Sequence, residues 1–242
     1  MSTLFCVGDS YKQENAIKYK DSEVKEGTFY LGYRDIPSLL KKYASGTRAI
    51  DFGCGTGRST RFLKGLGYET LGVDVSRAML QQAIELDPSG RYLHIENEKI
   101  PVIDSSCDVI FASFVICTIP TKAQLVAVYK EVQRCLKNGG IFIATTAADH
   151  FYTGKWLSYD VEYPENVHLQ SGDPVKFYLK NLDIELVNYY WMHEDYTEIA
   201  QATSLKMVDR LLPLGHTSDN MQWVSEMHEP PYAIYVYQNE KV

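Results

Sequence analysis

Two carboxylates and a run of glycines are the residues of this sequence whose types and spacing are best suited to chemistry. Asp51 closes a short apolar run, and three glycines follow it at alternate positions. These are Gly53, Gly55 and Gly57. Glycine permits positive φ and leaves no Cβ between the backbone and a ligand. A second apolar run ends in Asp74, where an α/β nucleotide site places the carboxylate that binds ribose. The pattern predicts a site for a nucleotide-like cofactor.

The spacing of the glycines distinguishes this loop from a dinucleotide site. Dinucleotide folds use Gly-x-Gly-x-x-Gly, in which the third glycine packs a helix whose N-terminus faces a pyrophosphate. Here the spacing is Gly-x-Gly-x-Gly, and Arg58 stands at the position of that third glycine. A dehydrogenase that uses NAD is therefore disfavoured.

The elements around the loop alternate between strand and helix, which predicts a parallel sheet with right-handed crossovers. The expected strands are Arg48–Phe52, Glu69–Val73, Arg91–Ile95, Asp108–Ile116 and Ile141–Thr146. The expected helices between them are Ser59–Leu66, Arg77–Leu86, capped by Ser76, and Lys122–Cys135. Asn138-Gly139-Gly140 is expected to be the turn into the last of these strands, and residues 11–44 are expected to be helical in large part.

The composition changes beyond residue 147, where all three tryptophans and five of the six histidines lie. A hairpin is expected from Pro174–Leu179 and Glu185–Trp191, then a helix from about Glu194 to Thr203 and two strands, Lys206–Leu212 and Tyr232–Tyr237. The aromatic residues of this region have two interpretations. They form a cap that lines a pocket for a planar or amphipathic small molecule, or they pack a small antiparallel layer onto the sheet.

The overall composition excludes some function classes. The net charge of −7 argues against a large nucleic-acid footprint, which needs a basic face. The five cysteines include no Cys-x-x-Cys pair, so we expect neither a metal site nor a disulfide framework. No long apolar run and no secretory leader are visible, which favours a cytoplasmic protein without membrane contact.

The glycine loop resembles motif I of the class I S-adenosylmethionine-dependent methyltransferases, and four further segments match that family in order. Residues 95–101 resemble its Gly-Asp-Ala-Glu-x-Leu-Pro segment, and residues 104–108 its Asp-x-Ser-Phe-Asp. Residues 113–120 resemble Ser-x-x-Leu-His-His-Leu-Pro, although Cys117-Thr118 replaces the two histidines, and residues 134–140 resemble Arg-x-Leu-Lys-x-Gly-Gly. The resemblance is strong over residues 11–146 and holds only in outline beyond them.

The resemblance implies an α/β fold: a Rossmann-like, seven-stranded, mostly parallel sheet with an antiparallel last strand, helices on both faces and a small antiparallel cap. We expect one domain over residues 1–242. Within it, residues 1–47 are a helical segment, 48–146 the cofactor-binding core, 147–192 a cap, and 193–242 the last helix and sheet edge.

The resemblance also assigns roles in binding S-adenosylmethionine, or its product S-adenosylhomocysteine. Asp51 would orient the loop or meet the methionine ammonium, while Gly53 and Gly55 admit the backbone to the cofactor and Asp74 accepts both ribose hydroxyls. The adenine would contact Val75, Glu96 and Asn97, and Ser113 would lie beside the methionine portion. The methionine carboxylate needs a donor, for which Arg34 and Tyr19 are the candidates.

Methyl transfer from a sulfonium is an in-line displacement, so alignment of the two reactants supplies much of the acceleration. Asp149, His150 and Tyr152 follow the last strand of the parallel run, at the edge where open α/β sheets bind ligands. They are the candidates to contact the acceptor or to act as a base.

Three functional hypotheses follow from these residues. The first is a methyltransferase that acts on oxygen or nitrogen of a small molecule, and the second is a catalytically silent sensor or scaffold that binds the same cofactor. Methylation of nucleic acid is the third. The acidic charge and the lack of an Asn/Asp-Pro-Pro-aromatic element near residue 113 count against it.

Overall fold

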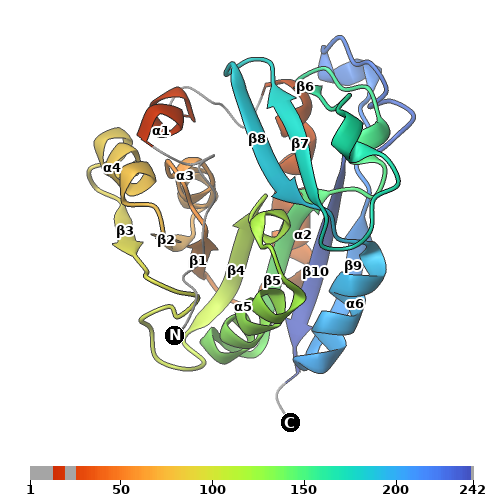
Figure 1. Ribbon diagram of the computed structural model, residues 1–242. Helices are drawn as coiled ribbons and strands as arrows, with labels where there is room; N and C mark the ends of the chain where they lie inside the picture. Colours follow the sequence, from red (N-terminus) through yellow and green to blue (C-terminus); the bar gives the residue numbers. More distant parts are fainter. Residues whose placement is uncertain (1–12, 20–25, 241–242) are drawn as a thin grey trace.

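The computed structural model describes residues 13–19 and 26–240, and its main element is a seven-stranded sheet (Figure 1). The strand order is β3-β2-β1-β4-β5-β10-β9. The strands are β1 (Arg48–Phe52), β2 (Glu69–Asp74), β3 (Arg91–His94), β4 (Cys107–Ser113), β5 (Leu136–Ala147), β9 (Leu205–Leu211) and β10 (Tyr232–Asn239). Only β10 runs antiparallel to the other strands of this sheet. This is the predicted Rossmann-like architecture, in which the last strand along the chain, β10, is antiparallel to the others.

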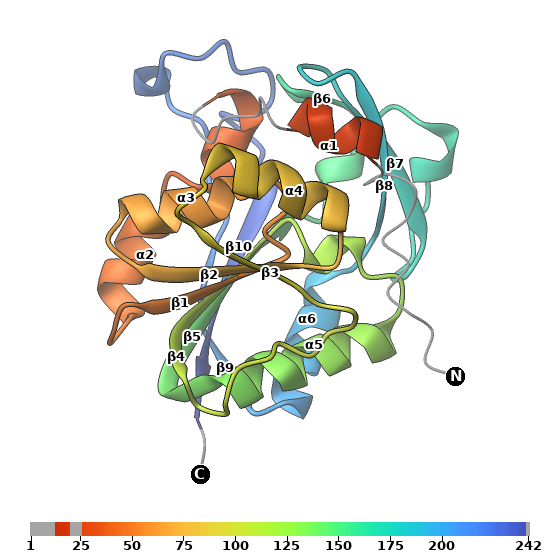
Figure 2. The same cartoon turned by 90° about the vertical axis from the view of Figure 1, so that its left-hand side faces the viewer.

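Helices cover both faces of the sheet, as Figure 2 shows. One face carries α2 (Ile36–Tyr43), α3 (Arg58–Gly65) and α4 (Arg77–Leu86), and the other carries α5 (Lys122–Cys135) and α6 (His193–Ala202). The central strand β4 is buried along almost its whole length, because helices lie on both of its faces. Within the described ranges, no helix combines the length and the apolar content needed to cross a membrane.

The predicted element boundaries hold for the helices that have clear caps. Helices α4 and α5 begin and end at the predicted residues, and Ser76 Oγ accepts a hydrogen bond from the backbone N–H of Met79 at 3.3 Å. The expected turn before the fifth strand was wrong, because β5 already starts at Leu136 and absorbs Gly139, at φ 77°, within the strand. The shifted register between β4 and β5 accommodates this irregularity.

The N-terminal segment is less helical than the sequence indicates. Its described part contains α1 (Gln13–Tyr19), a 3-10 turn η2 (Gly27–Gly32) and α2, while residues 11, 12 and 20–25 lie outside the described residues. Pro37 lies in the first turn of α2, as expected, where its missing N–H has no partner to lose.

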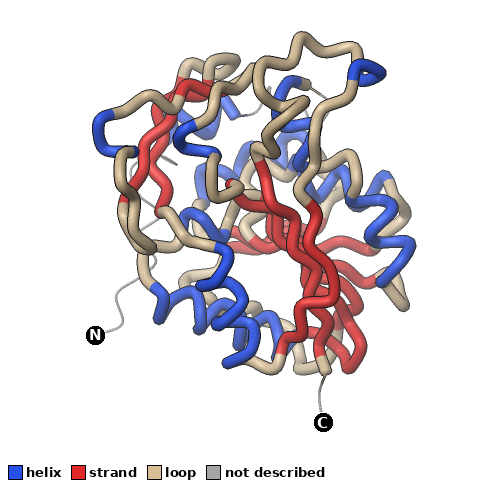
Figure 3. Tube along the Cα trace, turned by 90° about the vertical axis from the view of Figure 1, so that its right-hand side faces the viewer, coloured by secondary structure: helices blue, strands red, loops and turns tan. Residues whose placement is uncertain are grey.

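A second, three-stranded antiparallel sheet forms the predicted cap. It consists of β6 (Tyr159–Asp160), β7 (Pro174–Leu179) and β8 (Ile184–Tyr189), in the order β6-β7-β8. Figures 1 and 3 show it as a separate group of strands near the carboxyl ends of the central ones. Short 3-10 turns accompany it: η3 (Ile116–Thr118), η4 (Phe151–Thr153) and η5 (Pro164–Asn166), with η6 (Thr217–Asp219) further along the chain.

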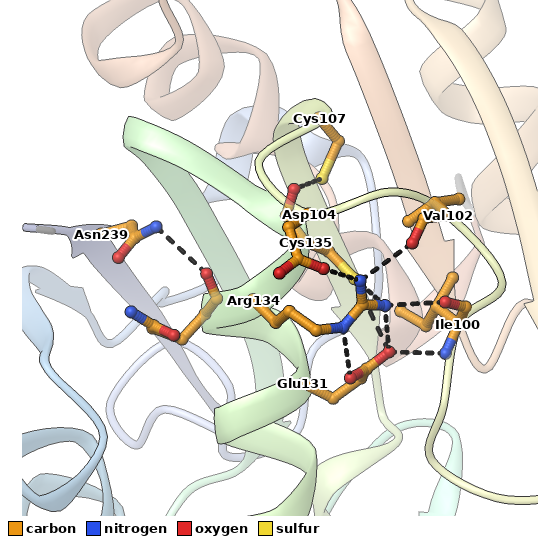
Figure 4. Close-up of polar contacts among 9 residues, drawn as sticks. Ile100, Val102, Asp104, Cys107, Glu131, Arg134, Cys135 and Asn239 are labelled. Carbon is orange, nitrogen blue, oxygen red and sulfur yellow. Dashed lines mark hydrogen bonds and ion pairs between the residues drawn. The ribbon is translucent and has the colours of Figure 1, made fainter.

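Arg134, near the end of α5, holds the loop that joins β3 to β4 (Figure 4). Its guanidinium donates to the backbone carbonyls of Ile100 at 2.8 Å and Val102 at 2.9 Å. It also contacts the carboxylates of Glu131 and Asp104, each at 2.6 Å. A guanidinium has five N–H donors, against three in the ammonium group of lysine, so it can serve these four acceptors at once. The arginine of the predicted Arg-x-Leu-Lys-x-Gly-Gly segment therefore fixes the loop that follows β3.

We expect Arg134→Gln to lower the free energy of unfolding by about 3 kcal/mol, because it leaves the buried Glu131 carboxylate without its cation. Urea unfolding at neutral pH measures the change. Arg77→Gln is the matched control, since Arg77 and its neighbour Glu96 are exposed and 4.0 Å apart, and a change of less than about 0.5 kcal/mol is expected there. Equal effects of the two variants would contradict the role of Arg134.

Candidate functional site

A cavity lies where the carboxyl ends of β1, β2 and β4 meet the cap. Gly53 follows β1, while Asp74 ends β2 and Ser113 ends β4, and all three line the cavity. Parallel strands bring their carboxyl ends to one edge of the sheet, and ligands of open α/β folds bind there. The far wall comes from the cap strands β7 and β8. Glycine loop and cap thus border one continuous space.

The structure brings eight of the thirteen predicted site residues to this cavity and leaves five outside its lining. The eight are Tyr19, Gly53, Gly55, Asp74, Val75, Asn97, Ser113 and Tyr152. The five are Arg34, Asp51, Glu96, Asp149 and His150.

Asp74 is held in a fixed orientation at the end of β2. Its Oδ2 accepts from the N–H of Gly55 and its Oδ1 from the N–H of Ser76, both at 2.7 Å. Burial raises the pKa of the Asp74 carboxyl, and these two backbone donors oppose the rise. Each carboxylate oxygen retains lone pairs for a further donor, so the group can receive two adjacent hydroxyls.

Asp51 lies behind the glycine loop and is fully buried. Its Oδ2 accepts from the hydroxyls of Ser59, at 2.7 Å, and Thr60, at 2.6 Å, on the first turn of α3. Its Oδ1 has no hydrogen-bond partner among the described residues. Burial raises the pKa of Asp51 to about 6, although the two hydroxyls oppose this. The two hydroxyl contacts support the loop-orienting role, and the unpaired Oδ1 is the atom available for the other predicted role, contact with the methionine ammonium.

Arg34 does not reach the cavity, contrary to its predicted role. Its guanidinium binds the carboxylate of Asp35 at 3.0 Å and the backbone carbonyl of Leu214 at 2.8 Å, and lies 3.6 Å from Asp219. These contacts hold the 212–231 segment against the N-terminal one. Among the described residues that line the cavity, the cation is instead Arg58, whose position in the sequence showed only a departure from the dinucleotide motif.

Arg58 begins α3 directly after the third glycine. Its guanidinium lies over the Phe29 ring, 4.3 Å from the centroid, and 5.5 Å from the centroid of Tyr33. Arginine stacks on aromatic faces, and its planar set of five N–H donors suits a carboxylate. We therefore expect Arg58, rather than Arg34, to bind the methionine carboxylate.

Arg58→Gln is expected to weaken binding of S-adenosylhomocysteine by about 10- to 30-fold, the usual contribution of a charge-assisted hydrogen bond. Arg34→Gln, the matched control, should change the dissociation constant by less than about twofold, because its charge lies outside the cavity. Isothermal titration calorimetry measures both. The assignment fails if Arg34→Gln has the larger effect.

The loop after β3 places one of its two predicted adenine contacts, Asn97, at the cavity and the other, Glu96, outside the cavity lining. Glu96 points to solvent, with 79% of its side chain exposed, while Asn97 and Glu98 line the cavity. The Asn97 side chain accepts from the Lys99 N–H at 2.9 Å, which closes a tight turn. The segment is in the predicted place, but its acid at position 98 is the one that borders the cavity.

Two of the three candidates for the acceptor side lie away from the cavity. His150 is exposed at the start of η4, and Asp149 lies 3.8 Å from the guanidinium of Arg210. Tyr152 lines the cavity, and burial raises the pKa of its hydroxyl, so it stays protonated at neutral pH. No histidine is among the described residues that line the cavity, so the structure offers no imidazole base there.

Several residues that shape the acceptor side were not predicted from the sequence. Tyr33 is one, and its Oη accepts a hydrogen bond from Ser113 Oγ at 2.7 Å. Phe114, at φ 60°, turns the chain out of β4 earlier than predicted and directs its ring between Phe29 and Tyr232. A side chain at positive φ is strained, and such residues cluster at functional sites. Further rings from distant segments complete the wall: Phe151, Tyr159 and Phe177.

The residues present fit S-adenosylmethionine. Gly55 has φ 53°, and a Cβ built on it would meet nothing within 4 Å, so the backbone offers an open surface to a ligand. Asp74 matches a ribose diol, Arg58 matches a carboxylate, and the unpartnered Oδ1 of Asp51 lies behind the loop as an acceptor for a cationic group. Burial also raises the pKa of Cys54 far above its usual value, so this loop residue is a neutral thiol.

Residues 50–144 match the family model of the methyltransferase domain. Among curated proteins, the malonyl-[acyl-carrier protein] O-methyltransferase of Pectobacterium atrosepticum is 30% identical over 105 residues, which are 43% of this chain and 40% of that protein. The protein of the same name from Serratia marcescens is 30% identical over 120 residues, 48% of this chain and 45% of that one. The matches thus span less than half the length of these relatives.

Solved structures resemble the whole fold at low sequence identity. The CcbJ methyltransferase from Streptomyces caelestis superposes with a TM-score of 0.65 at 17% identity, over 96% of this chain and 98% of that one. An S-adenosylmethionine-dependent methyltransferase from Mesorhizobium loti gives 0.64 at 16% identity, over 86% of this chain and 98% of that one. The matched segment contains the glycine loop, Asp74 and Ser113. Fold, motif order and domain match agree: residues 50–144 are a methyltransferase domain, set in a fold like that of solved S-adenosylmethionine-dependent methyltransferases.

Proposed function

We propose that this protein transfers a methyl group from S-adenosylmethionine to an oxygen or nitrogen atom of a small molecule. The observation that carries the proposal is that one continuous cavity joins the glycine loop to an aromatic pocket under the cap. Two relatives are named malonyl-[acyl-carrier protein] O-methyltransferases, an activity of those proteins that agrees with methyl transfer to oxygen. The net charge of −7 speaks against nucleic acid as the acceptor.

When bound, the cofactor supplies a methyl group on a positively charged sulfur. The chain's part is to hold the reactants and to exclude water. Asp74 and Arg58 fix opposite parts of the donor, while the rings of Phe29, Phe114 and Tyr232 close the space beyond it. Holding two reactants in line removes most of the entropic barrier to their encounter. The tyrosines of the wall stay protonated, so proton removal is not their task.

The competing function is a catalytically silent module that binds the same cofactor. A two-stage experiment separates the two. Calorimetry first measures the affinity for S-adenosylhomocysteine, and a screen of phenols, amines and carboxylic acids then follows release of S-adenosylhomocysteine from S-adenosylmethionine. Turnover of one acceptor class supports the proposal. Tight cofactor binding with a blank screen favours the silent module, and absence of binding contradicts both.

A further inference from the structure

Two polar side chains in the acceptor part of the cavity have buried atoms that find no hydrogen-bond partner of ordinary geometry among the described residues. These atoms are Tyr152 Oη and Asn188 Oδ1. Both side chains line the cavity, 3% and 6% exposed, and the Asn188 side chain lies near enough to the Tyr152 hydroxyl to oppose the rise of its pKa. A buried polar atom left unpaired costs about 1–3 kcal/mol. Two such atoms at one cavity wall indicate a ligand that pairs with them.

Asn188 interrupts the pattern of its strand. Along β8 the inward positions are Ile184, Leu186 and Asn188, which alternate with exposed residues. The period of two calls for a third apolar side chain at position 188. Asn188 Nδ2 instead donates to Cys117 Sγ at 3.4 Å, a weak acceptor, which leaves Oδ1 as the unpaired atom.

The two unpaired atoms complement a neutral hydroxyl group. Asn188 Oδ1 can only accept, so the ligand must bring a donor, and the hydroxyl of Tyr152 can donate to a ligand oxygen. A carboxylate has no donor for Asn188, and an ammonium group would share the cavity with the Arg58 cation. The surrounding wall is aromatic. The rings of Phe151 and Tyr159 lie edge to face with their centroids 5.1 Å apart, and the Phe177 ring packs against both. Such a wall suits a flat ring.

We propose that the methyl acceptor is an aromatic molecule with a free hydroxyl group that binds between Tyr152 and Asn188. This inference rests on the proposed function. An amide oxygen holds the hydroxyl proton without removing it, so this hydroxyl anchors the acceptor and another atom of the molecule receives the methyl group.

The test measures binding rather than turnover. Protein saturated with S-adenosylhomocysteine is titrated, with NMR detection, with 4-ethylphenol, ethylbenzene, 4-ethylanisole and 4-ethylbenzoate. We expect 4-ethylphenol to bind about fivefold or more tightly than each of the other three, since one good hydrogen bond contributes about 1 kcal/mol. Equal affinities for the phenol and the hydrocarbon, or tightest binding of the benzoate, would overturn the proposal.

Two variants test whether the preference for the phenol over the hydrocarbon arises at Tyr152 and Asn188. Tyr152→Phe and Asn188→Leu each keep the side-chain volume and should reduce the ratio of phenol to hydrocarbon affinity to about one. Tyr196→Phe is the control, because that buried tyrosine lies outside the cavity lining and should leave the ratio unchanged. A preference that survives in both cavity variants places the hydroxyl elsewhere and contradicts the assignment.

Calorimetry with S-adenosylhomocysteine on the same samples distinguishes a failure of the proposed hydroxyl site from a failure of the proposed function. If the wild-type protein binds S-adenosylhomocysteine but does not prefer the phenol, only the hydroxyl site between Tyr152 and Asn188 is contradicted. Absent cofactor binding counts against the proposed function itself, whatever the probes show. Wild-type affinity for S-adenosylhomocysteine in a variant also demonstrates that its fold is intact.

Discussion

Asp74→Asn is expected to weaken the binding of S-adenosylhomocysteine by about 100-fold, the largest change we expect from one substitution in the cavity. The carboxylate has an oxygen for each ribose hydroxyl and is already oriented by the N–H groups of Gly55 and Ser76. An amide replaces one acceptor by a donor, which then faces either an N–H group of the loop or a hydroxyl of the ribose. Calorimetry at pH 7.5 measures the loss.

A modified ligand shows whether the loss arises at the ribose. The 2′-deoxy analogue of S-adenosylhomocysteine should bind wild-type protein about tenfold more weakly than the parent ligand, and should show little such penalty in Asp74→Asn. If both proteins show the same penalty, Asp74 does not bind the ribose. Circular dichroism melting checks that the variant keeps its fold.

The sequence predicted the central fold well because its signals there are local. The Ser76 cap and the apolar face of α5 are read within a few residues of one another, and both helices have the predicted boundaries. The glycine loop is also one short segment, so its glycines and Asp74 lie at the cavity as expected. Boundaries failed where long-range pairing decides them, as for β5, whose strand pairing overrides the turn preference of Gly139.

The acceptor side could not be predicted, because its residues converge from segments far apart in the chain. Phe29, Phe177 and Tyr232 are neighbours only in the folded protein, and each alone has the character of an ordinary core residue. The surroundings of the two charged side chains Arg58 and Arg34 could not be predicted for the same reason. Arg34 follows an aromatic residue and Arg58 a glycine, and neither neighbourhood shows that Arg34 contacts Leu214 and Asp219 while Arg58 lines the cavity. The order of residues alone does not contain that information.

Asp51 should make the free protein less stable as the pH rises from about 4 to about 6. Burial raises the pKa of Asp51 to about 6 in the folded protein, against an ordinary value of 3.8. Between these values the folded chain keeps a proton that the unfolded chain has released, so stability falls with rising pH. The loss at neutral pH amounts to about 3 kcal/mol.

Asp51→Asn removes this titration. We compare the free energy of unfolding of the variant with that of the wild type at pH 4 and at pH 7.5. The difference, variant minus wild type, should be about 2–3 kcal/mol more positive at pH 7.5 than at pH 4. Urea unfolding at both pH values measures the shift. Asp108→Asn is the control of opposite sign: burial acts to raise the pKa of Asp108, but Lys137 Nζ at 2.6 Å and the Arg48 N–H outweigh it and hold that pKa below its ordinary value. That variant should therefore lose stability at pH 7.5 and recover it only as the pH falls below about 4.

The same carboxyl links stability to binding. If the cationic end of the cofactor lies near the unpartnered Oδ1 of Asp51, the ligand favours the charged carboxylate and its binding releases a proton. The affinity for S-adenosylhomocysteine should then rise between pH 5 and pH 7 in wild-type protein and stay level in Asp51→Asn. Parallel pH profiles for the two proteins would confine Asp51 to its structural contacts with Ser59 and Thr60. Divergent profiles would mean that a destabilising buried acid is retained because it helps to bind the ligand.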